Sequence, residues 1–233
     1  MNRKFIGLMF LISLSILSIF QIVLDYTFDS QRENAASISK DTEYYIYIQI
    51  EDKTLYLLQN GKCIKQYPIA SGRSGLPSPL GTWKIIEKSD WGEGFGGSWM
   101  GLDIPWGTYG IHGTLAPESI GSGASAGCIR MFSRDAAELY DIVPVGTEVA
   151  IVNGLFGPFG RGYDEINPGD RGADVLAIQQ RLKQLGYYKG NLDGIYEDDL
   201  KLAVHNFQRA NHLTAENTVT RETWLKMGFR EFE

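Results

Sequence analysis

The stretch Tyr44-Tyr45-Ile46-Tyr47-Ile48-Gln49-Ile50 indicates the fold class, because it is dense in β-branched and aromatic residues. A second run of this kind, Thr54–Leu58, leads to Asn60-Gly61, and the strand-like run Cys63–Ile69 follows. Asn-Gly is a strong signal for a two-residue hairpin turn, since both residues readily adopt positive φ. The chain therefore predicts a β-hairpin at the start of a mainly β domain.

Further strands and one helix are expected downstream of this hairpin. The expected strands are Thr82–Ile86, a short piece near Ile104, Tyr109–Ile111 and Glu148–Val152. The one helix is Ser133–Tyr140, with Ser133 as a possible N-cap and Asp135 near its positive end. Residues 44–153 are thus predicted to form a β-sandwich or barrel.

The pattern changes after a glycine-rich segment, residues 154–166, which reads as a linker. Val175, Ile178 and Leu182 recur at helical spacing, and Gly186 lies where that helix would end. Two more helices are expected at Leu200–Phe207 and Thr220–Leu225, with Thr220 as a cap and Gly228 as a stop. Residues 167–229 are therefore predicted to form a small all-α three-helix domain, which we expect to be a binding module.

Residues 1–24 are predicted to be a membrane anchor or a signal segment. Arg3 and Lys4 precede the uncharged run Phe5–Leu24, and about 20 apolar residues are enough to cross a bilayer. A signal core is shorter, about 7–15 residues, and ends in a small-x-small cleavage site, which is not evident after Leu24. These features favour an N-terminal transmembrane helix followed by a polar stalk, residues 25–43.

Both alternatives, the single-pass anchor and the cleaved signal, place the remaining chain outside the cytoplasm, since positive residues precede the apolar run. The formal net charge of −6 over 233 residues argues against nucleic acid as the main partner, because phosphate binding requires a basic face. The membrane is the partner that the apolar run itself indicates.

Two short segments carry the candidate chemistry: Ile111-His112-Gly113-Thr114 and Ser125-Ala126-Gly127-Cys128-Ile129-Arg130. A cysteine nucleophile needs a base, commonly imidazole, and amide donors for the developing oxyanion. Arg130 lies two positions beyond Cys128, so in an extended chain both point to the same side. There Arg130 would hold a substrate carboxylate or support the loop.

Spacing alone leaves other interpretations open. A lone cysteine sixteen positions after a lone histidine also occurs by chance. Cys128 and Cys63 are alternatively a disulfide pair, since exported proteins retain disulfides. Zinc binding is less favoured, because Cys63, His112 and Cys128 lack the close paired spacings of structural sites. No metal and no cofactor are expected.

The segments around His112 and Cys128 resemble the signature of the YkuD-type L,D-transpeptidases. Leu55-Tyr56-Leu57 with Asn60-Gly61, and Pro79-Leu80-Gly81-Thr82-Trp83, are similar to further family features. The resemblance covers residues 44–153. It implies a Cys nucleophile that forms a thioester with peptidoglycan stem peptides.

Carried over by residue, the resemblance implies that Cys128 is the nucleophile and His112 its base. Gly113 would orient the imidazole through its carbonyl, and the amides of Gly127 and Cys128 would form the oxyanion hole. The expected substrate contacts are Arg130, Ser125, Trp106 and Tyr109. The family usually has His directly before Gly-Cys, and here that position is Ala126, so we expect altered substrate handling.

The C-terminal domain resembles the peptidoglycan-binding type 1 repeat. The matching residues are Gly172-Ala173-Asp174-Val175, Gln179, Leu182, Leu185-Gly186-Tyr187-Tyr188, Asp193-Gly194, Ala203-Val204 and Phe207-Gln208. Together the resemblances imply an enzyme that transfers a tetrapeptide acyl group to an amine, giving a 3→3 cross-link. The alternatives are an L,D-carboxypeptidase, D-amino-acid exchange at the same site, or a noncatalytic wall-binding protein.

Overall fold

The computed structural model describes residues 43–92, 96–154, 157–160 and 162–230. The expected transmembrane helix, residues 1–24, lies outside the described residues, as does the stalk up to residue 42. None of the helices within the described ranges is long and apolar enough to cross a bilayer. Tyr44–Glu233 cluster as one compact unit.

The first three strands confirm the predicted hairpin. They are β1 (Tyr44–Gln49), β2 (Thr54–Gln59) and β3 (Lys62–Gly72). β2 and β3 pair antiparallel with Gln59 opposite Lys62, so Asn60 and Gly61 alone form the turn. Both turn residues have positive φ, 50° and 76°, which is the type I′ geometry that suits the twist of the flanking strands.

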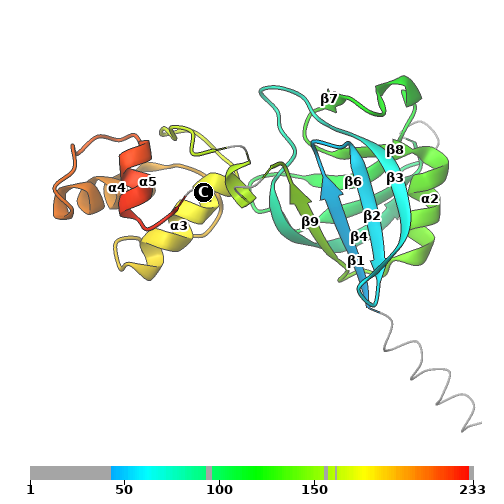
Figure 1. Cartoon of the computed structure of the whole chain (residues 1–233), viewed down its shortest axis with the longest axis horizontal. Coiled ribbons are helices and arrows are strands. Elements are labelled where there is room, and N and C mark those ends of the chain that lie inside the picture. Colours follow the sequence, from blue (N-terminus) through cyan, green and yellow to red (C-terminus); the bar gives the residue numbers. More distant parts are fainter. Residues whose placement is uncertain (1–42, 93–95, 155–156, 161, 231–233) are drawn as a thin grey trace, which may run out of the picture. The chain divides into compact units, whose positions relative to one another are not determined.

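The remaining strands complete a closed barrel (Figure 1). They are β4 (Gly81–Asp90), β5 (Ser98–Leu102), β6 (Tyr109–Thr114), β7 (Gly123–Ser125), β8 (Ile129–Phe132) and β9 (Glu148–Val152). The order is β2-β1-β9-β4-β5-β6-β8-β3-β7, and the additional β2–β3 pairing closes the sheet on itself. Of the two predicted alternatives, sandwich and barrel, the structure shows the barrel. The strand expected near Ile104 lies earlier in the chain, as β5.

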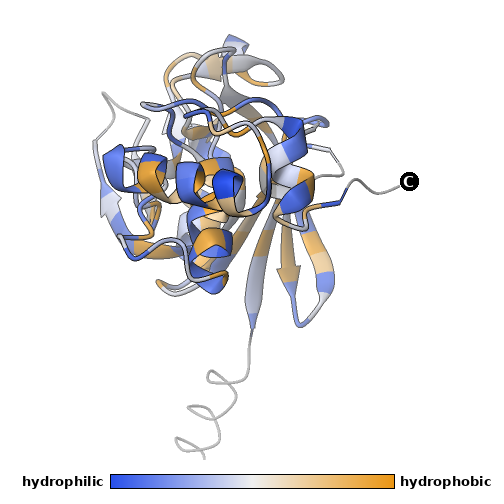
Figure 2. Ribbon diagram, turned by 90° about the vertical axis from the view of Figure 1, so that its left-hand side faces the viewer, coloured by the Kyte–Doolittle hydropathy of each residue, from blue (hydrophilic) through white to orange (hydrophobic). Residues whose placement is uncertain are grey.

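The first and last strands of the barrel are neighbours. β1 and β9 run parallel, with Tyr45 opposite Glu148 and Gln49 opposite Val152. Buried core residues alternate along both strands, Ile46 and Ile48 in β1 and Val149 and Ile151 in β9. Figure 2 colours the hydrophobic residues of the ribbon orange and the hydrophilic ones blue. The largest fully buried aliphatic side chains of the hairpin and its neighbours are Ile46, Ile48, Leu55, Leu57, Ile69 and Ile85.

The predicted barrel helix is present as α2 (Ser133–Ile142), which packs on β5, β6 and β8. The expected cap at Ser133 is wrong, because Phe132 occupies the N-cap position without a side-chain cap bond. The Ser133 hydroxyl instead donates to the carbonyl oxygen of Thr114 at 3.2 Å. It thus ties the start of α2 to the end of β6, the strand that carries His112.

The C-terminal domain contains the three predicted helices. They are α3 (Ala173–Gln184), α4 (Asp198–Ala210) and α5 (Arg221–Lys226). Thr220 caps α5 as predicted, accepting the Thr223 N–H at 3.4 Å. Gly186 and Gly228 follow α3 and α5 with φ of 81° and 92°, so both end their helices as glycines in the left-handed region. A separate core, including Val175, Leu182, Phe207 and Trp224, holds the domain together.

The segment predicted as a linker, residues 154–166, is packed where the structure describes it. The ring of Phe159 lies 4.7 Å from that of Trp224, in an edge-to-face contact. Ile166 is 2% exposed and forms a backbone bridge with Val219. Phe159 and Ile166 of this segment therefore pack with the helical core.

Candidate active site

The motif residues come together on two neighbouring strands. β6 and β8 pair in parallel, with His112 opposite Arg130. Cys128 immediately precedes β8, and its sulfur is hydrogen-bonded by the backbone of Gly110. Because alternate residues of a strand share a face, Cys128, His112 and Arg130 project to the same side. The parallel pairing thus joins residues that lie sixteen positions apart in the chain.

The imidazole of His112 is oriented by its own strand. Nδ1 lies 2.6 Å from the carbonyl oxygen of Gly113, so in neutral imidazole Nδ1 carries the proton and Nε2 is the basic nitrogen. Burial lowers the pKa of His112 below its ordinary value of 6.5, the Gly113 contact opposes this, and the charge of Arg130 lowers the pKa further. The ring is therefore neutral near pH 7 and able to accept a proton.

The thiol of Cys128 is half-buried and protonated at rest. Burial raises its pKa above the ordinary 9.0, while the Gly110 hydrogen bond and the charge of Arg130 oppose that shift. A thiol with a raised pKa needs a base to become a nucleophile. No hydrogen bond joins the sulfur to His112 in the described part of the chain, which is common before substrate tightens such contacts.

The loop before Cys128 is held by the hydroxyl of Ser125. This hydroxyl accepts the Gly127 N–H at 3.0 Å and donates to the Cys128 carbonyl at 2.6 Å. Ser125 is 1% exposed, so its hydroxyl shapes the loop, and its expected contact with substrate stays a prediction. The Gly127 N–H is engaged within the loop, and its expected role in the oxyanion hole also stays a prediction. The N–H of Cys128 remains the candidate oxyanion donor.

Glycine is required directly before Cys128. Gly127 has φ of 121°, and a Cβ at this position would lie 2.6 Å from Cε1 of Tyr109. Both the backbone conformation and the close ring therefore exclude a side chain. Ala126, which replaces the usual family histidine, is exposed, so nothing in its surroundings restricts its size.

An aromatic stack that the sequence reasoning did not assign to the site lies against His112. Trp91 and Trp99 stack with ring centroids 4.0 Å apart and an angle of 12°. Trp99 lies 5.8 Å from the His112 ring and donates Nε1–H to Glu87 at 2.9 Å. Trp91 is 43% exposed. The two rings therefore form an apolar surface beside the imidazole. Trp91 follows β4 and Trp99 lies in β5, so only the pairing of β4 with β5 could have indicated that the rings lie together.

Gly96 and Gly113 form a second close contact beside His112. A Cβ at Gly113 would lie 2.0 Å from the carbonyl oxygen of Gly96, and a Cβ at Gly96 would lie 2.4 Å from the Gly113 carbonyl. Gly96 therefore packs directly on the carbonyl group that orients the imidazole. Gly96, like the tryptophan stack, was not singled out by its sequence context.

Trp106 and Tyr109, the other expected substrate contacts, line a pocket next to the loop. Trp106 is 6% exposed and packs edge-to-face on Trp83, 5.2 Å away. Its ring also faces Gly194 of the C-terminal domain, where a Cβ would lie 2.4 Å from Cε3. Tyr109 is half-buried against Gly127. Trp106 thus has a packing role, whereas Tyr109 borders both the pocket and the nucleophile loop.

The alternatives based on sulfur pairing and metal binding find no support in the geometry. Cys63 and Cys128 are both free thiols, and Cys63 is exposed on β3. Within the described ranges, no three His, Cys, Asp or Glu side chains group as a metal site. The site therefore rests on a thiol, an imidazole and a guanidinium.

A β barrel that carries a histidine on one strand and a cysteine directly before the neighbouring strand defines the class of the catalytic domain. The family described as "L,D-transpeptidase catalytic domain" (YkuD) matches residues 43–151. The family described as "Putative peptidoglycan binding domain" matches residues 171–227. The chain belongs to the L,D-transpeptidase family, and both resemblances predicted from the motifs are confirmed.

Two Bacillus subtilis relatives support this assignment. "Putative L,D-transpeptidase YkuD" of Bacillus subtilis is 45% identical over 109 residues, covering 46% of this chain and 65% of that protein. "Putative L,D-transpeptidase YqjB" of the same organism is 30% identical over 126 residues, covering 47% of this chain and 71% of that protein. A crystal structure of an Enterococcus faecium L,D-transpeptidase mutant aligns with a TM-score of 0.42 and 27% identity, over 47% of this chain and 49% of that chain. The match thus spans slightly less than two thirds of the YkuD relative.

Proposed function

We propose that this protein is a peptidoglycan L,D-transpeptidase that works through a thioester on Cys128. The observation that carries the proposal is the placement of an oriented, neutral imidazole and a thiol on neighbouring segments of the barrel. His112 on β6 is held by Gly113 with its basic nitrogen available, and it lies opposite Arg130 of β8, two residues beyond Cys128. The donor is a tetrapeptide stem with an L-to-D bond between its third and fourth residues.

In the first step His112 takes the thiol proton and the sulfur attacks the carbonyl of the third stem residue. A C–S bond forms, the C–N bond to the fourth residue breaks, and His112 returns the proton to the leaving amine. In the second step an amine on another stem attacks the thioester. The C–S bond breaks, an amide forms, and the proton returns to the sulfur, giving a 3→3 cross-link. The Cys128 N–H stabilises the oxyanion in both steps.

The charge of Arg130 serves this scheme in two ways. It favours the thiolate of Cys128 and disfavours protonation of His112, so it keeps the base neutral while assisting the nucleophile. Its guanidinium is also placed to bind a carboxylate of the stem. Water or a free D-amino acid as the second reactant would give the carboxypeptidase and exchange reactions at the same site.

Mass spectrometry of a disaccharide-tetrapeptide incubated with the protein tests the proposal. We expect loss of the fourth residue together with dimer, and the mass of a thioester on the protein. Cys128→Ala should abolish all three, whereas Cys63→Ala, which removes the exposed free thiol, should change none. Equal turnover by both variants would contradict the cysteine mechanism. Stem binding without turnover by the folded wild type would favour a noncatalytic wall-binding protein.

We also propose that residues 1–24 anchor the protein in a membrane and that its domains act outside the cytoplasm, on the wall side of that membrane. The proposal is supported by Arg3 and Lys4 before an uncharged run and by the peptidoglycan-binding family match. Protease added to intact cells whose wall has been removed should digest the domains. Protection until the membrane is lysed would contradict this location.

A further inference from the structure

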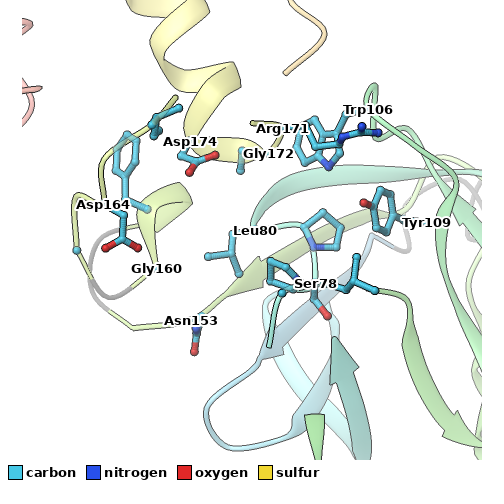
Figure 3. A pocket seen from close by; sticks show the side chains of 18 of the residues that line it. Ser78, Leu80, Trp106, Tyr109, Asn153, Gly160, Asp164, Arg171, Gly172 and Asp174 are labelled. Atoms are coloured by element: carbon cyan, nitrogen blue, oxygen red, sulfur yellow. The ribbon is translucent and has the colours of Figure 1, made fainter. Parts of the chain in front are cut away.

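A pocket of about 670 Å³ lies beside the nucleophile loop, with walls from the barrel and from the C-terminal domain (Figure 3). The barrel contributes the loop 75–80 together with Trp106 and Tyr109. The C-terminal side contributes Arg171 and Asp174 at the start of α3. Ligand pockets typically have volumes of roughly 300–1,000 Å³, so this pocket is large enough for a peptide-sized group.

Tyr109 and Pro77 connect the pocket to the active site. Both line the pocket, and both contact Gly127: a Cβ there would lie 2.6 Å from the Tyr109 ring and 3.2 Å from the Pro77 carbonyl oxygen. Cys128 follows Gly127 directly. The pocket therefore shares a wall with the loop that carries the nucleophile, and a ligand held in it lies next to that loop.

The C-terminal side of the pocket carries charges that are not paired with one another. Figure 3 shows Arg171 and Asp174 across the pocket from Ser78 and Leu80. Arg171 forms no ion pair and no side-chain hydrogen bond with any residue that the structure describes. The carboxylate of Asp174 accepts the Val175 N–H at 2.8 Å, which leaves capacity for a further donor. A cation and an anion thus face the pocket separately.

The surroundings of Asp174 favour a positively charged ligand group. Burial raises the pKa of Asp174, the backbone N–H groups of Val175 and Asp174 oppose that shift, and the charges of Asp170 and Asp164 add to it. Negative charge is therefore disfavoured at this carboxylate unless a cation approaches. An ammonium group bound in the pocket would supply that cation.

We propose that this pocket binds a peptidoglycan stem peptide that bears both an ammonium and a carboxylate group, the first against Asp174 and the second against Arg171. Neutral glycan offers neither charge, so the charge pattern selects the peptide. The C-terminal domain then recognises the stem and holds it beside the loop of Cys128. The identity of the ligand rests on the proposed function.

Calorimetric titration of the full-length protein with a soluble stem tripeptide tests this inference. The tripeptide lacks the bond that Cys128 attacks, so binding is measured without turnover. Arg171→Gln and Asp174→Asn should each weaken binding about tenfold, the usual effect of losing a hydrogen bond to a charged group. Asn keeps the acceptor for the Val175 N–H, and Arg171→Lys should retain part of the affinity. Arg134→Gln, which changes a side chain 92% exposed on α2, is the matched control.

Three results would overturn the inference. The first is that the wild type does not bind the tripeptide, and the second is that both variants bind it with wild-type affinity at unchanged Tm. The third is that the variants lose binding of a disaccharide without a stem but keep binding of the tripeptide. Thioester formation on the same preparations separates this inference from the proposed function. If thioester forms but Arg171 and Asp174 do not affect tripeptide binding, only the pocket assignment fails. If Cys128→Ala keeps full turnover while tripeptide binding still depends on both residues, only the cysteine mechanism fails.

Discussion

The carbonyl oxygen of Gly113 lies 2.6 Å from Nδ1 of His112, so the residue that follows the histidine in the chain fixes the direction of its ring. In many cysteine and serine enzymes this role belongs to a distant carboxylate or amide side chain. A neutral carbonyl orients the imidazole with little added negative charge. This agrees with the lowered pKa of His112 and with a base that stays neutral at rest.

Removing this base should abolish acylation without unfolding the barrel. His112→Ala should slow thioester formation by about 10²–10⁴-fold, the range for a positioned general base. Stopped-flow fluorescence or rapid-quench mass spectrometry with a carbapenem measures that rate. His205→Ala, in α4 of the C-terminal domain, is the control. Equal rates for the two variants would rule out His112 as the base.

The pH dependence of acylation follows from the directions of the two pKa shifts. Acylation needs neutral His112 and the Cys128 proton, and the pKa of His112 is lowered below 6.5 while that of Cys128 is raised above 9.0. The midpoint of the acid limb, where His112 is half protonated, should therefore lie below pH 6.5. Ionisation of Cys128 should have its midpoint above pH 9.0. A measured profile with its acid limb above pH 7 would contradict this.

Replacing Arg130 should move the acid limb in a defined direction. The charge of Arg130 lowers the pKa of His112, so Arg130→Gln should raise that pKa and shift the acid limb to higher pH. The same change removes a charge that lowers the pKa of Cys128, so alkylation of the thiol by iodoacetamide should slow at a fixed pH. NMR titration of His112 measures the expected rise of its pKa directly. Arg130→Lys should leave both values near those of the wild type.

The glycine before the nucleophile should tolerate no side chain. Gly127→Ala places a Cβ at φ of 121° and 2.6 Å from Tyr109, which should cost about 1–3 kcal/mol of stability and displace Cys128. We expect loss of thioester formation and a lower free energy of unfolding in urea. Gly61→Ala shares the positive φ of 76° but has no atom within 4 Å of its Cβ, so it isolates backbone strain from the clash. Full activity in Gly127→Ala would show that the loop adapts.

The closed barrel should depend on its inward-facing side chains. Leu57 is 0% exposed, so Leu57→Ala should lower the free energy of unfolding by about 2–5 kcal/mol through lost burial and a cavity. Ile64, on the neighbouring strand β3, is 43% exposed, and Ile64→Ala should change it by less than about 0.5 kcal/mol. Chemical denaturation of both variants measures the difference. Equal losses would contradict the observed inside and outside faces.

Local signals were sufficient to predict much of the fold. Asn60-Gly61 predicts its turn because both residues take positive φ at low cost, and the helical spacing before Gly186 predicts α3. Neither signal reports long-range pairing such as that of β1 with β9 or of β3 with β8, so the sequence left a sandwich and a barrel as alternatives. The apolar residues Phe159 and Ile166 lie in a glycine-rich segment, which concealed their packing on the helical core.

In the candidate site, too, some residues could be predicted from local sequence, whereas others are brought there by long-range pairing and packing. Cys128 and His112 were identified by the resemblance of their segments to a family motif, whereas their residue types and spacing alone left a disulfide and chance as alternatives. Ser125 belongs to that motif, yet only the structure shows its hydroxyl engaged by Gly127 and Cys128. Trp99 and Gly96 reach His112 through strand pairing and loop packing, which leave no local pattern in the chain.

The parallel pairing of β1 with β9 has a mechanical consequence. Tyr45 pairs with Glu148 and Gln49 with Val152, so residue 43 leaves the barrel at the end opposite to residue 153. Tension applied between residue 43 and the C-terminal helices therefore draws β1 and β9 past each other along their length. The hydrogen bonds between them carry that load together, in shear, and do not open one after another. We expect single-molecule pulling through these two points to rupture the barrel in one high-force event.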